Sequence, residues 1–450
     1  MLPVQQAETL ILNLVLPFNP HHDAEAVKLL DAVGRVLAEP VTGQLDFPHW
    51  DNSAMDGYAV RYEDVRSPSD GQPVTLDIVE EIPAGYQPQK SIQPGQAARI
   101  FTGAVMPAGA DTVVIQEDTE RQGDRVTILS TPNPQAFVRH QGAFYKAGTP
   151  LLQPGIKLQA AEIAVLAAAQ CAQVRVFRRP RVAILSTGDE LVGIDQPLQP
   201  GQIVDSNRYA LAALVAEAGC EPVLMDVVPD QLEALRTAIS QAIAAADMVL
   251  SSGGVSVGDY DYVDEILADL GATIHIRSVA VKPGKPLTVA TIRRQEAGDE
   301  GVGEWMSGRV REIPSTPSPL YPSTSVSSPL PLSPISLYFG LPGNPVSAMV
   351  TFWRFVLPAI RKLSGVREPW HPAFVSAIAR QELRSDGKRE SYLWGRLELV
   401  NGQYEFELAG GSHSSGNLIN LAGTNGLAVV PLGETAIARG ELVQVMFTLI

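Results

Sequence analysis

The part of the chain between residues 181 and 271 alternates strand-like and helix-like patterns, and this alternation restricts the fold more than any other feature. Short apolar runs are typical of buried strands, whereas apolar residues at helical spacing indicate the helices between them. Repetition of this kind favours a doubly wound parallel sheet, in which ligands bind beyond the carboxyl ends of the strands. The expected strands are 181–185, 222–228 and 248–250, and the expected helices are 206–218 and one that carries Leu232, Leu235, Ile239 and Ile243.

The third of these strands runs into a loop rich in glycine and serine, residues 251–258, and a helix follows the loop. Glycine lets the backbone approach a ligand closely, and backbone N–H groups and serine hydroxyls can donate to an anion. An ordinary tight turn between a strand and a helix would show the same glycines. The candidate ligand-binding residues of this loop are Ser252, Gly253, Gly254, Ser256 and Gly258.

Carboxylates accompany this loop, which favours a ligand-binding site over a simple turn. Asp259 and Asp261 follow it directly, and Asp189 and Glu190 follow the first strand, at the same expected edge of the sheet. Carboxylates repel a phosphate unless a hard cation such as Mg²⁺ lies between them and the ligand. The four acidic residues are therefore the candidate metal ligands of a phosphate-and-metal site.

Two further segments have the character of anion sites. Lys282 and Lys285 lie in a Lys-Pro-Gly-Lys-Pro turn that would hold two ammonium groups close together, although an exposed basic turn would look the same. Asn344 and Pro345 fit the N-cap and first position of a helix. Pro358 should kink or break that helix.

The remaining patterns predict a chain of several domains. Apolar residues Ala26, Leu29, Leu30 and Val33 predict a second helix near the N-terminus. Asn401-Gly402 between two strand-like runs predicts a β-hairpin. The expected domains are a discontinuous helical domain (1–46 and 146–178), a mostly-β domain (47–145, with strands 74–79, 97–101, 112–116 and 125–129), an α/β domain (179–368) and a C-terminal β-barrel (369–450). A Pro/Ser-rich segment at about 295–335 is expected to be a disordered insertion.

Composition excludes some classes of protein. The net charge of −15 over 450 residues argues against general nucleic-acid binding. The two cysteines, Cys171 and Cys220, suggest neither a zinc site nor a disulfide framework. The N-terminal region has no secretory pattern, and its most apolar stretch, Thr9–Phe18, is too short to span a membrane. We expect a cytoplasmic protein without membrane contact.

Near the N-terminus, the segment from Asp51 to Ala59 combines two acids and an asparagine in a loop before a strand. Thr102 stands beside a glycine at the end of another expected strand and could donate to an anion. Turn chemistry explains both segments equally well when each is taken alone.

Taken together, the motifs resemble one family, the molybdopterin molybdenumtransferases, which include the E domain of gephyrin. The resemblance covers nearly the whole chain apart from the Pro/Ser-rich segment. Five motifs in the right order carry it, and they are Asp51–Ala59, Ser186–Leu191, Ser252–Gly258, Lys282–Pro286 and Leu341–Ser347.

The resemblance implies an activity and an assembly. Relatives of this kind insert molybdate into adenylylated molybdopterin, which releases AMP and molybdenum cofactor, with a divalent cation that is usually Mg²⁺. They have four domains and form elongated homodimers, with the active site between the parallel-sheet domain of one subunit and the β domain of the other. The adenylyltransferase that supplies the substrate and the molybdoenzymes that receive the product are then possible partners.

The resemblance also implies roles for particular residues. Asp56 and Thr102 of the partner subunit would complete the cleft, and Arg389 joins the candidates that hold molybdate, a dianion that should avoid carboxylates. The candidate catalytic residues are Asp56, Thr102, Glu190, Asp261, Lys282 and Lys285. The candidate cofactor-binding residues are Thr187, Gly188, Ser252, Gly253, Gly254, Ser256, Gly258, Pro342, Gly343, Asn344, Pro345 and Ser412.

One departure from the family pattern leaves alternatives open. Phe144 stands where relatives usually have an acidic residue, and Val105 where they often have proline. A scaffold or binding protein with a weakened site is therefore one alternative, and a molybdopterin adenylyltransferase, which has the same sheet domain, is another. Retention of Asp56, Glu190, Asp261 and both lysines of the basic turn favours the molybdenum-inserting enzyme over the scaffold, and the additional domains favour it over the adenylyltransferase.

Overall fold

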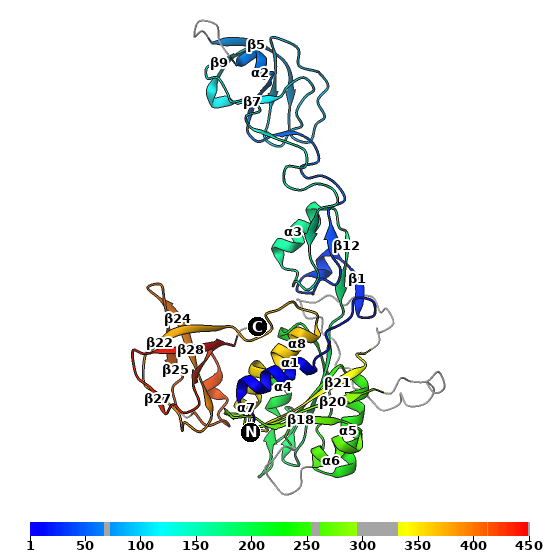
Figure 1. Ribbon diagram of the computed structural model, residues 1–450, viewed down its shortest axis with the longest axis vertical. Coiled ribbons are helices and arrows are strands. Elements are labelled where there is room, and N and C mark those ends of the chain that lie inside the picture. The colour runs from blue at the N-terminus through cyan, green and yellow to red at the C-terminus, as the bar shows by residue number, and fades with distance from the viewer. Residues whose placement is uncertain (67–72, 254–261, 295–331, 412, 449–450) are drawn as a thin grey trace, which may run out of the picture. The chain divides into compact units, whose positions relative to one another are not determined.

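A computed structural model describes the chain except for residues 67–72, 254–261, 295–331, 412 and 449–450 (Figure 1). The predictions for Gly254, Ser256, Gly258, Asp259, Asp261 and Ser412, and for most of the Pro/Ser-rich segment, lie outside the described residues. The chain forms two compact units. Unit 1 contains Met1–Glu39, Pro154–Ile163 and Ala172–Ile450, and unit 2 contains Pro40–Gln153 and Ala164–Cys171.

Unit 2 is built around a six-stranded sheet of strand order β7-β4-β6-β5-β9-β8. Only β5 and β6 pair in parallel, and the strands close over Tyr58, Leu76, Val114 and Val126. The four strands expected here from the sequence are confirmed. The strands are β4 (Gly57–Val60), β5 (Val74–Ile82), β6 (Gln96–Ile100), β7 (Thr112–Ile115), β8 (Thr119–Gln122) and β9 (Arg125–Ile128).

Short elements complete unit 2. A helix, α2 (Tyr62–Val65), and a 3₁₀ turn at Gln116–Asp118 connect strands of the sheet. Two small antiparallel pairs lie outside it, β3 (Asn52–Ser53) with β10 (Val138–Arg139), and β2 (Val41–Thr42) with β11 (Pro150–Leu152).

The N-terminal part of unit 1 corrects one prediction. A helix is present as α1 (Val4–Leu14), but the second expected helix is a strand, β1 (Ala24–Lys28), followed by a 3₁₀ turn at Leu29–Ala32. Strand β1 pairs antiparallel with β12 (Gln173–Phe177), a partner far along the chain. Pairing with this distant strand, and not the local helical spacing, decides the structure here. Leu30, one of the apolar residues on which the predicted helix depended, is 77% exposed. A further helix, α3, spans Ala160–Ala168.

A second six-stranded sheet forms the centre of unit 1, with strand order β16-β13-β17-β21-β20-β18. The predicted parallel sheet is confirmed for its first four strands, whereas β20 runs antiparallel to both of its neighbours. The strands are β13 (Arg181–Ser186), β16 (Glu221–Leu224), β17 (Met248–Ser252), β18 (Thr273–Ser278), β20 (Pro286–Arg293) and β21 (Ile335–Leu341).

Helices cover both faces of this sheet (Figure 1). Alternate strand residues face opposite layers, so that Leu250 packs with the first layer and Val249 with the second. Burying one such large apolar side chain stabilises the fold by roughly 1.5–3 kcal/mol. The first layer contains α1, α4 (Ser206–Glu217), α7 (Pro345–Thr351) and α8 (Leu357–Leu363), and the second contains α5 (Leu232–Ala245) and α6 (Tyr262–Asp269).

The helical irregularity predicted at Pro358 takes the form of a π-helical turn, Phe352–Val356, between α7 and α8. Pro358 lies directly after this turn, as the second residue of α8, and the helical backbone continues through Val356 and Leu357. Among the residues that the structure describes, no helix combines the length and the apolar character that crossing a membrane requires.

The C-terminal strands close into a five-stranded barrel in the order β24-β25-β22-β28-β26, with β26 pairing back to β24. The predicted hairpin is confirmed at Asn401-Gly402, where both residues have a positive φ of 51° and 83°. The strands are β22 (Phe374–Ala379), β24 (Glu390–Val400), β25 (Gln403–Leu408), β26 (Gly426–Val430) and β28 (Leu442–Phe447). Smaller elements are β14 (Leu191–Val192) with β15 (Ile203–Val204), β23 (Leu383–Arg384) with β27 (Ala436–Ile437), and a 3₁₀ turn at Ile419–Leu421.

A strand pairing and a buried arginine are among the contacts that join the barrel to the sheet domain. Strand β19 (Val281–Lys282) pairs in parallel with β24 at Glu390 and Ser391. Buried Arg354, from the π-helical turn, donates to Glu8 of α1 at 2.7 Å and to the Tyr392 hydroxyl of β24 at 2.8 Å. Burial alone would raise the pKa of Glu8, but the hydrogen bonds from Arg354 and His371 lower it below its usual value.

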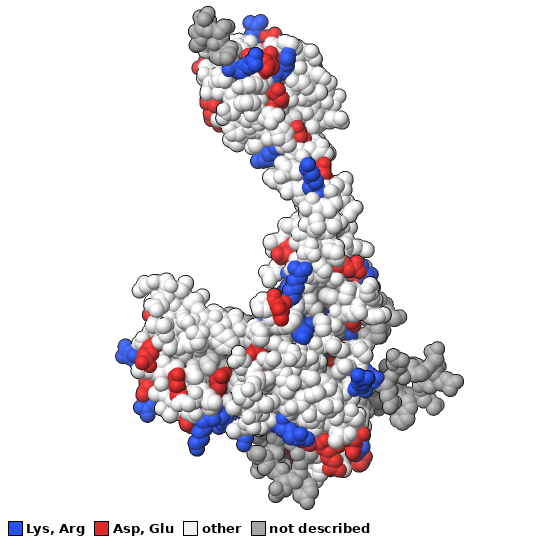
Figure 2. Space-filling model, viewed as in Figure 1, with Lys and Arg blue, Asp and Glu red and all other residues white. Residues whose placement is uncertain are grey.

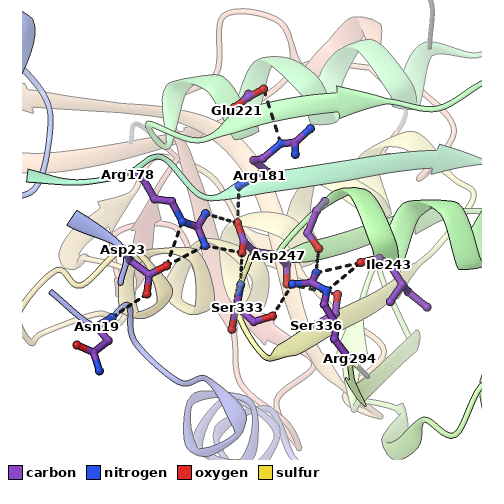
Figure 3. Close-up of polar contacts among 11 residues, drawn as sticks. Asn19, Asp23, Arg178, Arg181, Glu221, Ile243, Asp247, Arg294, Ser333 and Ser336 are labelled. Atoms are coloured by element: carbon purple, nitrogen blue, oxygen red, sulfur yellow. Dashed lines mark hydrogen bonds and ion pairs between the residues drawn. The ribbon is translucent and has the colours of Figure 1, made fainter. Parts of the chain in front are cut away.

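A buried ion-pair network ties the start of unit 1 to the sheet (Figure 3). The Asp247 side chain is fully buried and accepts two hydrogen bonds from Arg178, at 2.7 and 2.8 Å, and one each from the backbone N–H groups of Arg181 and Ser333. Arg178 also donates to Asp23 at 3.0 Å. Burial opposes the charge of Asp247, but the hydrogen bonds and the charge of Arg178 keep its pKa below the usual value.

Replacement of Asp247 by asparagine should lower the stability of unit 1 by about 3–5 kcal/mol, because Arg178 would remain buried without its main counter-charge. Because the pKa of Asp247 is lower in the folded state than its usual value, ionised Asp247 stabilises the fold at pH values above the usual aspartate pKa. This stabilisation is lost as the pH falls through the folded-state pKa. The difference between wild type and Asp247→Asn should therefore shrink below about pH 4. Denaturant unfolding measured between pH 3 and 8 tests this.

The matched control is Asp269→Asn, since Asp269 forms an ion pair with Arg236 while 46% of its side chain is exposed. Its effect should stay below about 1 kcal/mol at every pH. Equal effects of the two variants would contradict the role given to the buried pair.

Candidate functional site

A cavity of about 1120 Å³ lies between the carboxyl ends of the central sheet strands and the barrel, within unit 1. Residues of both signs of charge and many small polar residues line it. They include Thr187, Glu190, Asp205, Asn207, Ser252, Gly253, Lys282–Pro286, Pro342–Pro345, Arg384, Arg389, Tyr392, Trp394 and His413–Gly416. Ser412, a candidate from the sequence, is not among the described residues.

Strand register brings three loops to this cavity. Ser252 of β17 stands level with Ser186 of β13 on one side and with Leu341 of β21 on the other. The chain therefore leaves all three strands at the same height, as expected for parallel strands. The prediction that the segments after the first and third expected strands meet at one sheet edge is confirmed, and the segment after β21, which was not part of that prediction, joins them.

Gly253 is the point at which two of the loops come closest. It has a φ of +92°, and a Cβ at this position would lie 2.3 Å from the carbonyl oxygen of Thr187. A side chain would therefore strain the backbone and collide with it. On its other side, a Cβ on Gly343 would lie 3.6 Å from the Cα of Gly253, which is an ordinary contact.

Asn207 holds two of the loops together, and the sequence did not single it out. Its side-chain amide donates to the Ser252 hydroxyl at 2.6 Å and to the Gly343 carbonyl oxygen at 2.7 Å. Asp205 places it there, because the Asp205 carboxylate caps α4 by accepting from the Arg208 N–H group. The available signal was the polar Asp-Ser-Asn sequence at the start of a helix that follows the first strand's loop.

Five buried polar atoms on residues that line the cavity have no hydrogen-bond partner within the described part of the chain. They are Thr187 Oγ1, Asp205 Oδ2, Asn207 Oδ1, Trp394 Nε1 and His413 Nδ1. Leaving a polar group buried and unpaired costs roughly 1–3 kcal/mol. Their presence together at one cavity indicates that a bound ligand or water supplies the missing partners.

Acidic residues gather beside the first loop. The backbone N–H of Asp230 donates to Asp189 at 3.1 Å, and burial together with the charges of Asp189 and Glu190 raises the pKa of Asp230. Asp230 was not predicted from the sequence, because it follows a different strand and stands alone there. Among the described residues, no group of three or more His, Cys, Asp or Glu side chains has an arrangement that could hold a metal ion.

Basic residues lie on another part of the cavity wall. Lys282, Lys285 and Arg389, all named from the sequence, line it together with Arg384, which was not. Lys282 Nζ lies 3.0 Å from Asp386 Oδ2, and Arg389 lies 3.8 Å from the same oxygen. The hydrogen bond from Lys282 lowers the pKa of Asp386. The pairing of β19 with β24 explains why a turn of the sheet domain meets a loop of the barrel.

The predicted helix start at Asn344 and Pro345 is confirmed, since α7 begins at Pro345 with Asn344 in the N-cap position. The Asn344 side chain forms no capping hydrogen bond. The backbone N–H of Val346 donates instead to the Ser415 carbonyl oxygen at 3.1 Å, which draws the barrel loop against this helix.

Asp56 and Thr102 contact each other within unit 2. Both the backbone N–H and the hydroxyl of Thr102 donate to Asp56 Oδ1 at 2.7 Å, and these two bonds lower the pKa of Asp56. Phe144, the departure from the family pattern, is 65% exposed, and its ring centroid lies 5.7 Å from that of Phe47.

The structure thus brings most of the candidate residues of unit 1 to one place. Gly188 and Asp189 belong to the first loop but are not part of the lining. Asp56 and Thr102 belong to unit 2. The candidates that line the cavity are Thr187, Glu190, Ser252, Gly253, Lys282, Lys285, Pro342, Gly343, Asn344 and Pro345.

Three protein-family profiles match consecutive parts of the chain. The MoeA N-terminal region (domain I and II) matches residues 2–169, a probable molybdopterin binding domain matches residues 183–362, and the MoeA C-terminal region (domain IV) matches residues 376–448.

Individual proteins resemble the chain over most of its length. A molybdopterin molybdenumtransferase from Nostoc sp. is 59% identical over 443 residues, which cover 98% of this chain and 93% of that protein. One from Haemophilus influenzae is 33% identical and covers 92% of this chain and 91% of its own. The crystal structure of the molybdopterin biosynthesis MoeA protein from Pyrococcus horikoshii OT3 superposes with a TM-score of 0.77 at 27% identity, covering 99% of this chain and 100% of that one.

Replacement of Gly253 by alanine should destabilise unit 1 by about 1–3 kcal/mol or more, because the new methyl group meets a backbone oxygen at a positive φ. Gly343→Ala is the matched control, since its methyl group would make only an ordinary contact, and its effect on unfolding should be small. Denaturant unfolding of both variants measures the difference. Equal stability of the two would contradict the close approach of the loops at Gly253.

Proposed function

The chain belongs to the MoeA family of molybdopterin molybdenumtransferases, and we propose that it transfers molybdenum from molybdate to adenylylated molybdopterin with release of AMP. The observation that carries this proposal is the cavity in unit 1, where four of the five sequence motifs meet. A probable molybdopterin binding domain covers the strands that form its floor.

Hydrogen-bond donors of the sheet loops suit the phosphate of the pterin. Ser252 and Gly253 end β17 at the cavity, and Asn207 keeps the Ser252 hydroxyl in place. Backbone N–H groups and hydroxyls at a strand-to-helix loop favour a bound phosphate. The unpaired oxygens of Thr187 and Asn207 can accept hydrogen bonds from the ligand's own N–H or O–H groups.

The basic and acidic parts of the cavity lining favour different binding positions for the two substrates. Molybdate is a dianion and should bind where Lys282, Lys285 and Arg389 provide donors. Asp386 holds Lys282 in place while it offsets part of this positive charge. Glu190 contributes the acidic side, which would repel molybdate.

The acidic side has the residue types that suit a hard divalent cation such as Mg²⁺, but the described residues alone contain no group of three ligands that could hold one. Burial and the charges of Asp189 and Glu190 raise the pKa of Asp230, and a cation would offset this negative charge. Asp189 and Glu190 would hold the ion, and oxygen ligands of this type suit Mg²⁺. When bound, it would offset negative charge on the phosphoanhydride whose P–O bond breaks as AMP leaves. Asp259 and Asp261 lie outside the described residues and remain predicted ligands of the cation.

Asp56 and Thr102 are suited to orienting the substrate. Both hydrogen bonds from Thr102 reach Asp56 Oδ1, and no donor within the described residues is bonded to Oδ2. The lowered pKa keeps Asp56 ionised at neutral pH, so the carboxylate can accept from a substrate hydroxyl or amine. We propose that a homodimer places this pair at the cavity of the partner subunit.

Other parts of the proposal follow from the same reaction. An enzyme that adenylylates molybdopterin must supply the substrate, and apoenzymes that use the molybdenum cofactor must receive the product. We also propose a cytoplasmic location for this activity.

Glu190→Gln should slow AMP release by about 100-fold or more, because it removes a charge that offsets the cation beside the breaking bond. The assay uses adenylylated molybdopterin, molybdate and Mg²⁺, and a chelator should abolish turnover of the wild type. Glu217→Gln, at an exposed position on α4, is the control and should retain full activity. Turnover by Glu190→Gln at the wild-type rate would reject the cation-binding role of Glu190, whereas absence of turnover by the wild type would favour a scaffold function.

Mixing two inactive variants tests the shared site. If each site combines Glu190 of one subunit with Asp56 of the other, a mixed dimer of Glu190→Ala and Asp56→Ala subunits has one complete site. Random mixing makes half of the dimers mixed, so about a quarter of the wild-type activity should return. No recovery, with mixed dimers shown by native mass spectrometry, would place both residues in a site made by one chain.

A further inference from the structure

Unit 1 contains a second cavity, of about 290 Å³, that shares no lining residue with the first. Its walls come from the two segments that lead towards unit 2, from the linker before β13, from the end of α4, and from α8 with the chain that follows it. Five of the lining residues are cations, and the described lining contains neither Asp nor Glu. The cations are Arg35, Lys157, Arg178, Arg179 and Arg361.

Two of these cations are buried and already neutralised. Arg178 forms the network with Asp23 and Asp247, and Arg35 forms an ion pair with Glu25 while it donates to the Phe177 carbonyl oxygen at 2.8 Å. These residues form fixed parts of the wall.

The other cations contribute charge to the cavity. Within the described chain, neither Lys157 nor Arg361 has a carboxylate at ion-pair distance, and Arg361 donates only to two backbone carbonyl oxygens at 3.3 Å. Arg179 donates to the carbonyl oxygen of Gly219, also at 3.3 Å, as one of its contacts. Carbonyl oxygens orient the Arg361 guanidinium but do not neutralise it, so Lys157 and Arg361 contribute positive charge here.

The positive groups are close enough to influence one another and their surroundings. Burial lowers the pKa of Arg35, and the charge of Arg179 lowers it further against the effect of Glu25. Burial also raises the pKa of the Cys220 thiol to about 12, while Arg179 and Lys157 both oppose that increase. The chain has a net charge of −15 and its visible face mixes both signs of charge (Figure 2), whereas the described lining of this cavity contains cations and neither Asp nor Glu.

We propose that the second cavity binds the phosphate group of a small phosphomonoester. Guanidinium groups match the geometry of phosphate oxygens, and an ammonium adds a strong point charge. Apolar side chains of the lining, among them Phe177, Leu357 and Val366, suit a small organic group attached to the phosphate. The volume is at the lower end of the range of ligand pockets, which begins near 300 Å³, and therefore selects a small ligand.

Binding here would connect segments that are distant in sequence. Residues 34–36 and 157–159 run on into unit 2, whereas Arg179 precedes β13 and Arg361 belongs to α8. A ligand that contacts all of them binds only the folded unit 1, so it should raise the melting temperature of this unit as its concentration increases.

Isothermal titration calorimetry with phenyl phosphate and inorganic phosphate tests the proposal, at constant ionic strength. The titrated protein is the full chain carrying Lys282→Gln and Lys285→Gln, which suppresses phosphate binding in the first cavity. One site per chain is expected, with phenyl phosphate binding several-fold more tightly than inorganic phosphate. Adding Lys157→Gln or Arg361→Gln should weaken binding by about five- to tenfold, since each removes one charged donor.

Two controls accompany these variants. Lys157→Arg keeps the charge and should bind phenyl phosphate nearly as well, and Lys28→Gln, at an exposed lysine on β1, should have no effect. Circular dichroism verifies that each variant is folded. Unchanged affinity in a folded Lys157→Gln/Arg361→Gln variant would overturn the site, and sulfate binding as tight as phenyl phosphate would overturn the phosphomonoester class. Because turnover is not measured, neither outcome affects the proposed transferase activity.

Discussion

The parallel register of β13, β17 and β21 is the constraint on which the first cavity depends. Ser186, Ser252 and Leu341 end the three strands at one level, so the loops that follow leave the sheet side by side. Only a residue without a side chain lets the second loop pass Thr187, and Gly253 occupies that position. The amide of Asn207 then joins the second and third loops, so that backbone geometry and one buried side chain together form the cavity floor.

The barrel completes the cavity by two different kinds of contact. The backbone pairing of β19 with β24 brings the Lys282 turn against the barrel, and the buried Arg354 side chain connects α1, the π-helical turn and Tyr392. A π-helical turn is often found at functional sites. Here it places an arginine between two domains, and the Tyr392 it contacts lines the cavity. Domain packing and substrate binding therefore use adjoining residues.

The buried residue Arg178 has two roles in unit 1. It neutralises Asp247 inside the fold, and it also lines the second cavity. A buried ion pair of this kind contributes little net stability compared with an apolar pair, but removal of one partner is costly. Because Arg178 is held by carboxylates on one side, the less buried cations Lys157 and Arg361 determine the charge that a ligand in the second cavity would meet.

Local patterns in the sequence were sufficient for much of the fold. Strand and helix periods predicted three strands of the central sheet and helices that cover it, and the Asn-Gly pair predicted the hairpin between β24 and β25, because these features depend on neighbouring residues. The order of five motifs indicated the family, and the comparisons confirm it. Ten of the candidate residues of unit 1 line one cavity, and those that follow parallel strands do so because such strands send their carboxyl ends to one edge.

Contacts between distant segments were decided by the tertiary structure alone. Ala26, Leu29, Leu30 and Val33 have helical spacing, but Ala26 lies in β1, because β12 supplies a strand partner almost 150 residues later. Asp230 and Arg384 carry no local signal of a site, and the only signal for Asn207 is its polar helix start. Packing of α4 and of the barrel brings Asn207 and Arg384 to the cavity, and the loop after β16 brings Asp230 to Asp189. The sequence by itself therefore determined which elements form and which motifs they carry. Only three-dimensional packing decided which polar groups meet, because hydrogen bonds and charges act through space over a few ångströms, irrespective of separation along the chain.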